Sequence, residues 1–158
     1  MQEQGVPVTS IGLQGHDSLE RPSAEQHDAT ISDFARLGVK VVISELDISV
    51  LPSAISQQTA EVTANINQDP ALSLYTSGLP DALQKALAQR YGELFGVFLK
   101  HRDVITRATF WGVTDRDSWR NDWPVKGRTE YPLLFDRDGQ PKPAFHEVIS
   151  ASVVQRAH

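Results

Sequence analysis

Two carboxylates end a short, nearly continuous apolar run, and they are the side chains best placed to do chemistry. Glu45 and Asp47 are two residues apart, so in a strand they point to the same face. His16 ends an earlier strand-like segment, and Trp111 and Trp119 follow a later one. Sugar C–H faces stack on indole rings, while sugar hydroxyls need polar partners. The residue types therefore predict carbohydrate chemistry at the ends of three strands.

A retaining glycosidase is one class of enzyme that acts on sugars. It needs one ionised carboxylate as nucleophile and one protonated carboxyl as general acid, about 5 to 5.5 Å apart. Glu45 is the candidate nucleophile, and no other acid is an obvious partner. Position alone leaves other interpretations open: Glu45 as a solvated strand-end carboxylate, Asp47 as a cap or turn residue, and His16 as a core or loop histidine. No histidine or acid cluster has metal-ligand spacing, so we expect neither a metal nor a cofactor.

Alternating strands and helices must position these residues. Apolar, β-branched runs predict the strands, and helical spacing of apolar residues, with a capping box at Ser23 and Gln26, predicts the helices. This order predicts an α/β fold in which about three strand-helix units share a parallel sheet, well short of the roughly 250 residues of an eight-fold barrel. The expected elements are strands at 6–13, 39–46 and 104–112 and helices at 23–37, 81–100 and 144–154.

Two further features bear on the loops and on helix packing. The stretch 49–80 is polar and unusually long for a connection, which indicates a functional or mobile loop with some irregular helix inside it. Gly92 and Gly96 interrupt the apolar face of helix 81–100 at a cost of about 1 kcal/mol each. We therefore expect close packing against a neighbour at both glycines.

The composition of the 158 residues excludes several classes of function. Fifteen basic against 20 acidic residues give a net charge of -5, with no basic stripe, so nucleic acid is not an expected partner. The chain has no cysteine and therefore no disulfide framework. No apolar run has the length of a membrane span, and the first residues lack the basic and apolar regions of a signal peptide. We expect no membrane partner and no signal peptide in this chain.

Several motifs follow one another along the chain, among them Gly38–Ile48, which contains both acids. In this order they resemble family 10 glycoside hydrolases, the endo-β-1,4-xylanases. The segment Gly38–Ile48 matches the active-site signature of that family, with Glu45 at the position of its nucleophile. The similarity covers about residues 5–150 and implies part of a (β/α)8 TIM barrel, strands six to eight. Residues 1–158 would then be a C-terminal segment of the catalytic domain. Further matching motifs are Ile11–His16, Thr109–Asp115, Asp117–Trp119, Tyr131–Asp136 and Lys142–Ala144.

The resemblance also implies roles for the site residues. Glu45 would be the nucleophile, His16 would hydrogen-bond Glu45, and Asp47 would hold His16. Hydrogen bonds to the charged form keep a carboxylate ionised and oriented. The residues expected to bind the sugar are Gln14, near the reacting ring, and Trp111 and Trp119, along the glycone subsites.

One part of the family's machinery is absent from the sequence. The family's acid/base Glu lies in a Trp-Asp-x-x-Asn-Glu type motif, which does not occur here. We therefore expect the nucleophile-bearing part of a xylan-hydrolysing enzyme, secreted or periplasmic by resemblance, inactive without an N-terminal half. One alternative is an inactive half-barrel that binds xylo-oligosaccharides or self-associates through open sheet edges. Another is a different barrel glycosidase, such as a mannanase or a cellulase.

Overall fold

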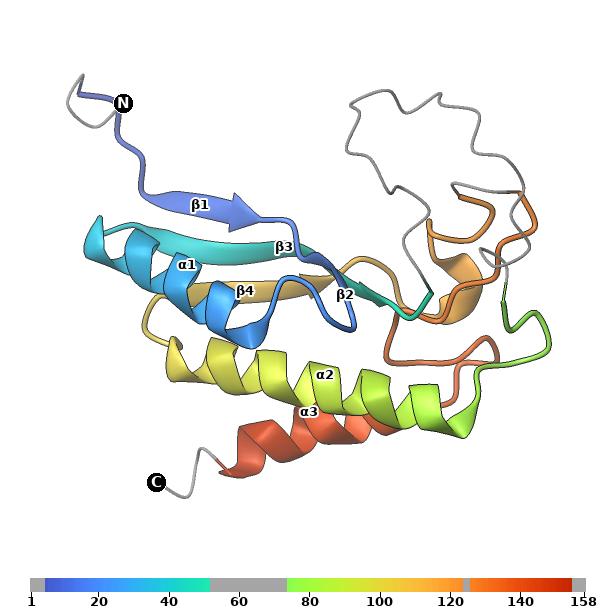
Figure 1. Ribbon diagram of the computed structural model, residues 1–158. Helices are drawn as coiled ribbons and strands as arrows, with labels where there is room; N and C mark the ends of the chain where they lie inside the picture. Colours follow the sequence, from blue (N-terminus) through green and yellow to red (C-terminus); the bar gives the residue numbers. More distant parts are fainter. Residues whose placement is uncertain (1–4, 52–73, 124–125, 155–158) are drawn as a thin grey trace.

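The computed structural model describes residues 5–51, 74–123 and 126–154, and within them strands and helices alternate along the chain (Figure 1). A short 3-10 helix, η3 (Asp115–Asp117), follows the last strand. The strands are β1 (Ser10–Leu13), β2 (His16–Ser18), β3 (Lys40–Ser49) and β4 (Ile105–Phe110), and the helices are α1 (Ala24–Arg36), α2 (Asp81–Lys100) and α3 (Pro143–Val154).

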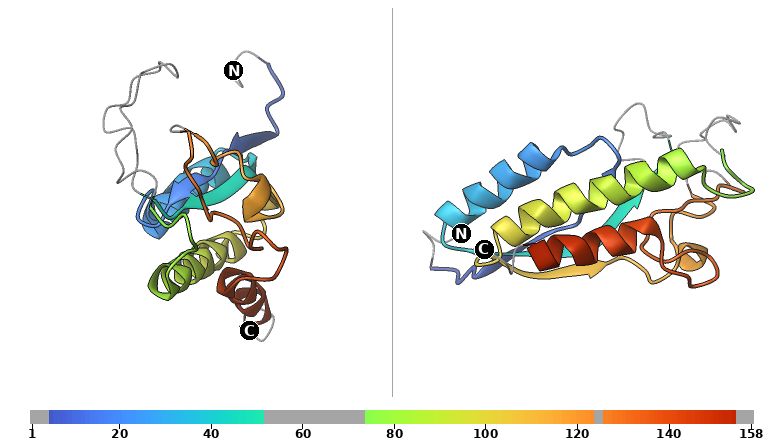
Figure 2. Two further views of the ribbon diagram at one scale, coloured as in Figure 1. Left: turned by 90° about the vertical axis from the view of Figure 1, so that its right-hand side faces the viewer. Right: turned by 90° about the horizontal axis from the view of Figure 1, so that it is seen from below.

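All pairs in the sheet are parallel, and β3 lies at its centre. β1 and β2 pair with β3 on one side, and β4 pairs with it on the other. The three helices lie along one face of this sheet, as Figures 1 and 2 show. The carboxyl ends of the strands meet at the end of the molecule that also carries the loop after β4 (Figure 1). The predicted α/β architecture of three strand-helix units is confirmed.

The predicted helices agree closely with the structure, and the strand ends differ. The capping box at Ser23 is present, because its Oγ accepts from the backbone N–H of Gln26 and the Gln26 side chain accepts from the N–H of Ser23. The central strand was predicted to end at 46 but continues to Ser49, so both acids lie inside it. β2 was not predicted. The stretch 49–80 was expected to contain some irregular helix. Most of it, residues 52–73, lies outside the described residues.

A β-bulge in β3 determines which way the two acids point. Past Ile43, this strand contains one more residue than the chain beside it on either side. Val41 and Ile43 are buried with the helices before the bulge, and Leu46 is buried with them after it. Glu45 and Asp47 therefore point away from the helices. Without the extra residue, Glu45 would point to the same side of the sheet as Ile43 and would face the helices. The bulge therefore turns this carboxylate toward the open face of the sheet.

The core lies between the sheet and α2. Leu87, Tyr91 and Leu94 of this helix are completely buried against the strands. Burial raises the pKa of Tyr91 well above its usual value, and its hydroxyl donates to the Pro132 carbonyl at 2.6 Å. This fully buried face fixes α2 on the sheet.

The two glycines of α2 differ in their surroundings. A Cβ built on Gly92 lies 3.6 Å from the carboxylate of Glu147 on α3, an ordinary packing distance. A Cβ on Gly96 meets nothing within 4 Å. The prediction of close packing is therefore wrong for Gly96, where the described chain leaves open space.

Gly15 joins β1 to β2 immediately before His16, and we predict that a side chain here is costly. Its φ is +86°, and an added Cβ lies 3.0 Å from the Ile43 side chain. Gly15→Ala should lower the free energy of unfolding by more than the roughly 1–2 kcal/mol that a left-handed residue costs, because the contact adds to the strain. Gly139→Ala is the matched control, with φ +78° and open space around it. Equal losses in urea unfolding would show that the contact with Ile43 does not matter.

Asp28 connects α1 to the end of α2 and should make stability depend on pH. Hydrogen bonds from Lys100, and then from His101, hold the pKa of this carboxyl below its usual 3.8. A depressed carboxyl pKa stabilises the fold above the unfolded value, and the gain is lost as pH falls through the folded value. Asp28→Asn should therefore be less stable than the parent above about pH 4, with the difference closing below it. Urea unfolding across this range measures the effect.

Asp33→Asn provides the comparison for Asp28. Asp33 is exposed, and its partner Arg36 lies in the same helix, so this pair joins no two elements. Exposed pairs of this kind contribute little. If Asp33→Asn reproduced the pH-dependent loss seen with Asp28→Asn, the contact between α1 and α2 would not be its cause.

Candidate active site

His16 lies between two carboxylates on the open side of the sheet. Its Nε2 is 3.0 Å from Oε2 of Glu45, and its Nδ1 is 3.0 Å from Oδ1 of Asp47. The pairing of β2 with β3 places His16 directly opposite Asp47. The side chains of Glu45 and His16 are 26% and 23% exposed, whereas that of Asp47 is completely buried. The hydrogen bonds expected among these three residues are present, and their catalytic roles stay a prediction.

The two predicted tryptophans lie beside the histidine ring. The ring of His16 is 5.0 Å from that of Trp119 and 6.5 Å from that of Trp111, centroid to centroid. Trp119 is fixed by its indole N–H, which donates to Oδ2 of Asp47 at 2.6 Å. Trp111 is 45% exposed and Trp119 is 37% exposed. The structure thus brings two solvent-facing aromatic rings to the acids.

Gln14 reaches the site through its backbone. Its carbonyl accepts from the N–H of Glu45 at 2.7 Å, which continues the strand pairing across the bulge. Its side chain is exposed. The predicted residue is therefore next to Glu45, and contact of its side chain with sugar stays a prediction.

Arg120 was missed by sequence reasoning. Its Nε and Nη2 lie 2.9 and 2.8 Å from Oδ1 of Asp47, and its guanidinium is 5.1 Å from the centroid of the Trp119 ring. A basic residue after a tryptophan in a polar loop normally faces water, so spacing gave no sign of this contact. The pairing depends on a strand more than 70 residues earlier in the chain.

The loop that carries Trp119 is anchored by a buried ion pair. Asp115 accepts from the backbone N–H of Leu133 at 2.9 Å and from Nζ of Lys142 at 2.8 Å. Burial raises the pKa of Asp115 against the influence of Lys142, and burial lowers the pKa of Lys142 against that of Asp115. Asp117 accepts from the Thr114 hydroxyl at 3.0 Å. These contacts of Asp115 and Asp117 hold the loop in place.

A second buried carboxylate holds the end of β3. Oε1 of Glu130 accepts from the Ser49 hydroxyl at 2.5 Å and from Nη2 of Arg128 at 2.7 Å. Ser49 is two residues beyond Asp47 on the same strand. This anchor, also missed from the sequence, fixes the strand end that carries the two acids.

The contacts assign different capacities to the two acids. Both oxygens of Asp47 already accept N–H groups and its side chain is completely buried, so Asp47 lacks the access that a general acid needs. Glu45 is partly exposed and lies within hydrogen-bond distance of one imidazole nitrogen, which leaves it accessible to act as a nucleophile. Within the described chain, no three His, Asp or Glu side chains gather as metal ligands. No described helix is long and apolar enough to cross a membrane.

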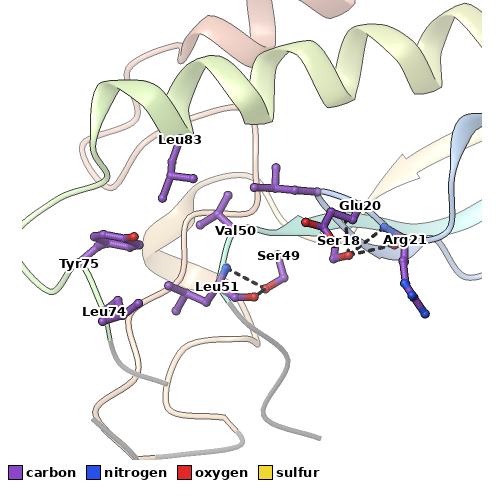
Figure 3. Close-up of a pocket in the computed structure, with 10 residues that line it drawn as sticks. Ser18, Glu20, Arg21, Ser49, Val50, Leu51, Leu74, Tyr75 and Leu83 are labelled. Carbon is purple, nitrogen blue, oxygen red and sulfur yellow. Dashed lines mark hydrogen bonds between the residues drawn. The ribbon is translucent and has the colours of Figure 1, made fainter. Parts of the chain in front are cut away.

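A cavity of about 670 Å³ lies beside the acids, at the rim of the sheet (Figure 3). Ser18 and Ser49 line it from the ends of β2 and β3, and Tyr75 and Leu83 line it from the other side. Ser18 and Ser49 form the second residue pair after the pair His16 and Asp47 along these two strands. None of the three predicted catalytic residues lines this cavity, so it adjoins the site without containing it.

Comparison with known proteins agrees with this geometry. The model of glycosyl hydrolase family 10 matches residues 1–151. Endo-1,4-beta-xylanase A of Xylanibacter ruminicola is 39% identical over 145 residues, which cover 92% of this chain and 39% of that protein. An endo-1,4-beta-xylanase of Geobacillus stearothermophilus is 36% identical over 150 residues, 95% of this chain and 41% of that protein. This chain thus spans about two fifths of the length of these relatives.

Solved structures show the same relation. A family 10 endoxylanase retrieved from sugarcane soil metagenome superposes with a TM-score of 0.84 at 42% identity, covering 94% of this chain and 41% of that one. The open parallel sheet with helices on one face is therefore part of the (β/α)8 barrel of a glycoside hydrolase. The chain belongs to glycosyl hydrolase family 10. It corresponds to the C-terminal part of the family's catalytic domain.

Proposed function

We propose that this chain is the nucleophile-bearing part of an endo-1,4-β-xylanase that cleaves internal xylosidic bonds with retention. The observation that carries the proposal is the partly exposed carboxylate of Glu45, held by His16, which is itself held by buried Asp47. The relatives above are named endo-1,4-beta-xylanases. A further similar structure, with a TM-score of 0.75 at 34% identity, is a mutant protein in complex with xylotriose.

The proposed reaction has two displacements. First, an oxygen of Glu45 bonds to the anomeric carbon as the glycosidic C–O bond breaks, and the leaving oxygen takes a proton from a carboxylic acid. Then water gives a proton back to that group, its oxygen bonds to the anomeric carbon, and Glu45 leaves as a carboxylate. Two inversions restore the starting configuration. His16 keeps the attacking carboxylate oriented throughout.

The general acid is proposed to lie in another part of the barrel. Asp47 is excluded by its contacts, and the sequence lacks the family's acid/base motif. We propose that an N-terminal part of the barrel supplies this carboxyl, with residues 1–158 as one segment of the catalytic domain. Xylan is a polymer too large to enter cells, so we also propose that the enzyme acts outside the cell or in the periplasm.

Complementation tests this proposal. The complemented barrel is defined here as this chain combined with the part of the Xylanibacter ruminicola relative that precedes the matched region. We expect hydrolysis of xylan by the complemented barrel and none by either piece alone. Mannan and carboxymethylcellulose serve as alternative substrates. Faster cleavage of either than of xylan would contradict the proposed substrate, and full activity of this chain alone would contradict the divided site.

A second candidate function is binding without catalysis. Trp111 and Trp119 expose aromatic surface in this chain, and β1 and β4 have no partner on their outer sides within the described sheet. Such edges favour association with another chain. Xylotriose titration in a calorimeter, together with sedimentation of this chain, tests the idea. No binding and a stable monomer at high concentration would contradict it.

A further inference from the structure

We propose that Arg120 is a positioning residue for the nucleophile and acts through Asp47. The inference rests on the proposed function, because it concerns how Glu45 is held for attack. The observation behind it is that Arg120 has two N–H groups within 2.9 Å of the same oxygen, Oδ1 of Asp47, that His16 contacts. The site is thus a line of four side chains, Glu45, His16, Asp47 and Arg120.

The first argument is the number of donors around Asp47. Oδ1 receives His16 and Arg120, and Oδ2 receives the indole N–H of Trp119 at 2.6 Å. These contacts fix the rotation of the carboxylate about its last bond. If Arg120 were removed, Oδ1 would lose the stronger of its partners, because guanidinium hydrogen bonds to carboxylates are charge-assisted. Asp47 could then turn, and both His16 and Trp119 would lose their support.

The second argument is charge. Each ring nitrogen of His16 faces a carboxylate oxygen at 3.0 Å, but a neutral imidazole has one N–H donor. Both contacts can be hydrogen bonds only if His16, Glu45 and Asp47 together carry one proton more than a neutral imidazole and two carboxylates do. Arg120 balances the charge of Asp47 with a cation that has no proton to transfer, because guanidinium stays protonated in proteins. It therefore opposes uptake of a proton by Glu45, which must stay ionised to attack.

The groups around Asp47 support this balance. Within the described residues, Arg120 is the cation in contact with Asp47, and His16 and Trp119 contact it from β2 and from the loop after β4. The charge of Asp47 also acts on Tyr91 of α2. The Arg120 side chain is 12% exposed, so water screens the pair weakly. Arg120 also lies against the face of Trp119, which links the nucleophile to one aromatic wall of the site.

Arg116 offers a matched control in the same loop. Its side chain is 62% exposed, and its partner Asp138, at 3.4 Å, is 86% exposed. Arg116→Met removes a guanidinium of the same chemistry without touching the four-residue line. Arg120→Lys keeps the charge but loses the fork of parallel N–H donors.

The experiment compares Arg120→Met, Arg120→Lys and Arg116→Met in the complemented barrel. We measure kcat and KM for xylotriose across pH, and solvent exchange of the Trp119 indole N–H by NMR. Arg120→Met should lower kcat by up to about 100-fold, as small misplacements of reacting groups do, with KM little changed. The acid side of its pH profile should move to higher pH, and the indole N–H should exchange faster. Arg120→Lys should recover part of kcat, and Arg116→Met should match the parent.

The results that would contradict a positioning role for Arg120 differ from those that would contradict the proposed function. Arg120→Met with the parent's pH profile and indole exchange would overturn the inference, and so would an effect on KM alone, which indicates a simple substrate contact. If the complemented barrel cleaved no xylan or xylotriose, the proposed function would fail, and indole exchange would still decide whether Arg120 positions Asp47 and Trp119.

Discussion

The complemented barrel with Glu45→Ala is expected to lose about 10⁴-fold or more in kcat on xylan, the effect of removing a covalent nucleophile. KM should change little, because the carboxylate contributes mainly to the transition state. The loss should be specific to this carboxylate because, of the two acids on the open face of β3, Glu45 is the exposed one and Asp47 is fully paired. Initial rates on xylan measure it.

Two controls separate chemistry from folding in the Glu45 experiment. Glu147→Gln changes an exposed glutamate on α3 and should keep the parent's rate. Adding azide to Glu45→Ala with an aryl xyloside should restore turnover and give the glycosyl azide of inverted configuration, because the small anion attacks where the carboxylate stood. Full activity of Glu45→Ala would remove Glu45 from the mechanism. Azide rescue with retained configuration would exclude direct displacement at this position.

Asp47→Ala is expected to lower the free energy of unfolding by about 3–5 kcal/mol, the usual cost of leaving a buried charge without its partner. The substitution removes the hydrogen-bond partner of three side chains at once: His16, Trp119 and Arg120. Arg120 is 12% exposed, so water compensates its guanidinium only partly. Activity should fall as well, because the support of His16 is lost. Chemical unfolding measures the first effect and xylan hydrolysis the second.

The double variant Asp47→Ala with Arg120→Met gives the sharper comparison. Removing both charges should recover part of the stability that Asp47→Ala loses, since no unpaired guanidinium remains. Asp138→Ala is the control: its pair with Arg116 is exposed and should contribute about 0–1 kcal/mol. Equal losses for Asp47→Ala and Asp138→Ala, or a purely additive double variant, would contradict a buried, coupled network around Asp47.

Much of the framework was predictable from local patterns. Helical spacing of apolar residues located α2, and the capping box at Ser23 located the start of α1, because both signals depend on neighbours within a few residues. The continuous apolar run around Val41 identified a strand buried in a parallel sheet. The period of two along a strand placed Glu45 and Asp47 on one face, and the structure agrees.

What the sequence did not reveal depends on contacts between distant segments. The bulge after Ile43 is defined by pairing with neighbouring strands. The apolar pattern of the sequence would be the same in a strand with the bulge and in one without it. β2 has three residues and exists through its pairing with β3. Arg120 and Glu130 look like surface charges until the fold buries each beside its partner. The spacing of apolar residues predicts single strands and helices, whereas these features arise only when the strands, helices and loops pack together.

The most direct test of the nucleophile assignment is covalent trapping. A 2-deoxy-2-fluoro xylobioside with a good leaving group should inactivate the complemented barrel, because the fluorine slows both displacements while the leaving group keeps formation of the glycosyl-enzyme fast enough for it to accumulate. Mass spectrometry of the digested protein should then show one added 2-deoxy-2-fluoroxylobiosyl group, on the peptide that contains Glu45. A label on another carboxylate, or steady turnover with inverted product and no label, would contradict the account.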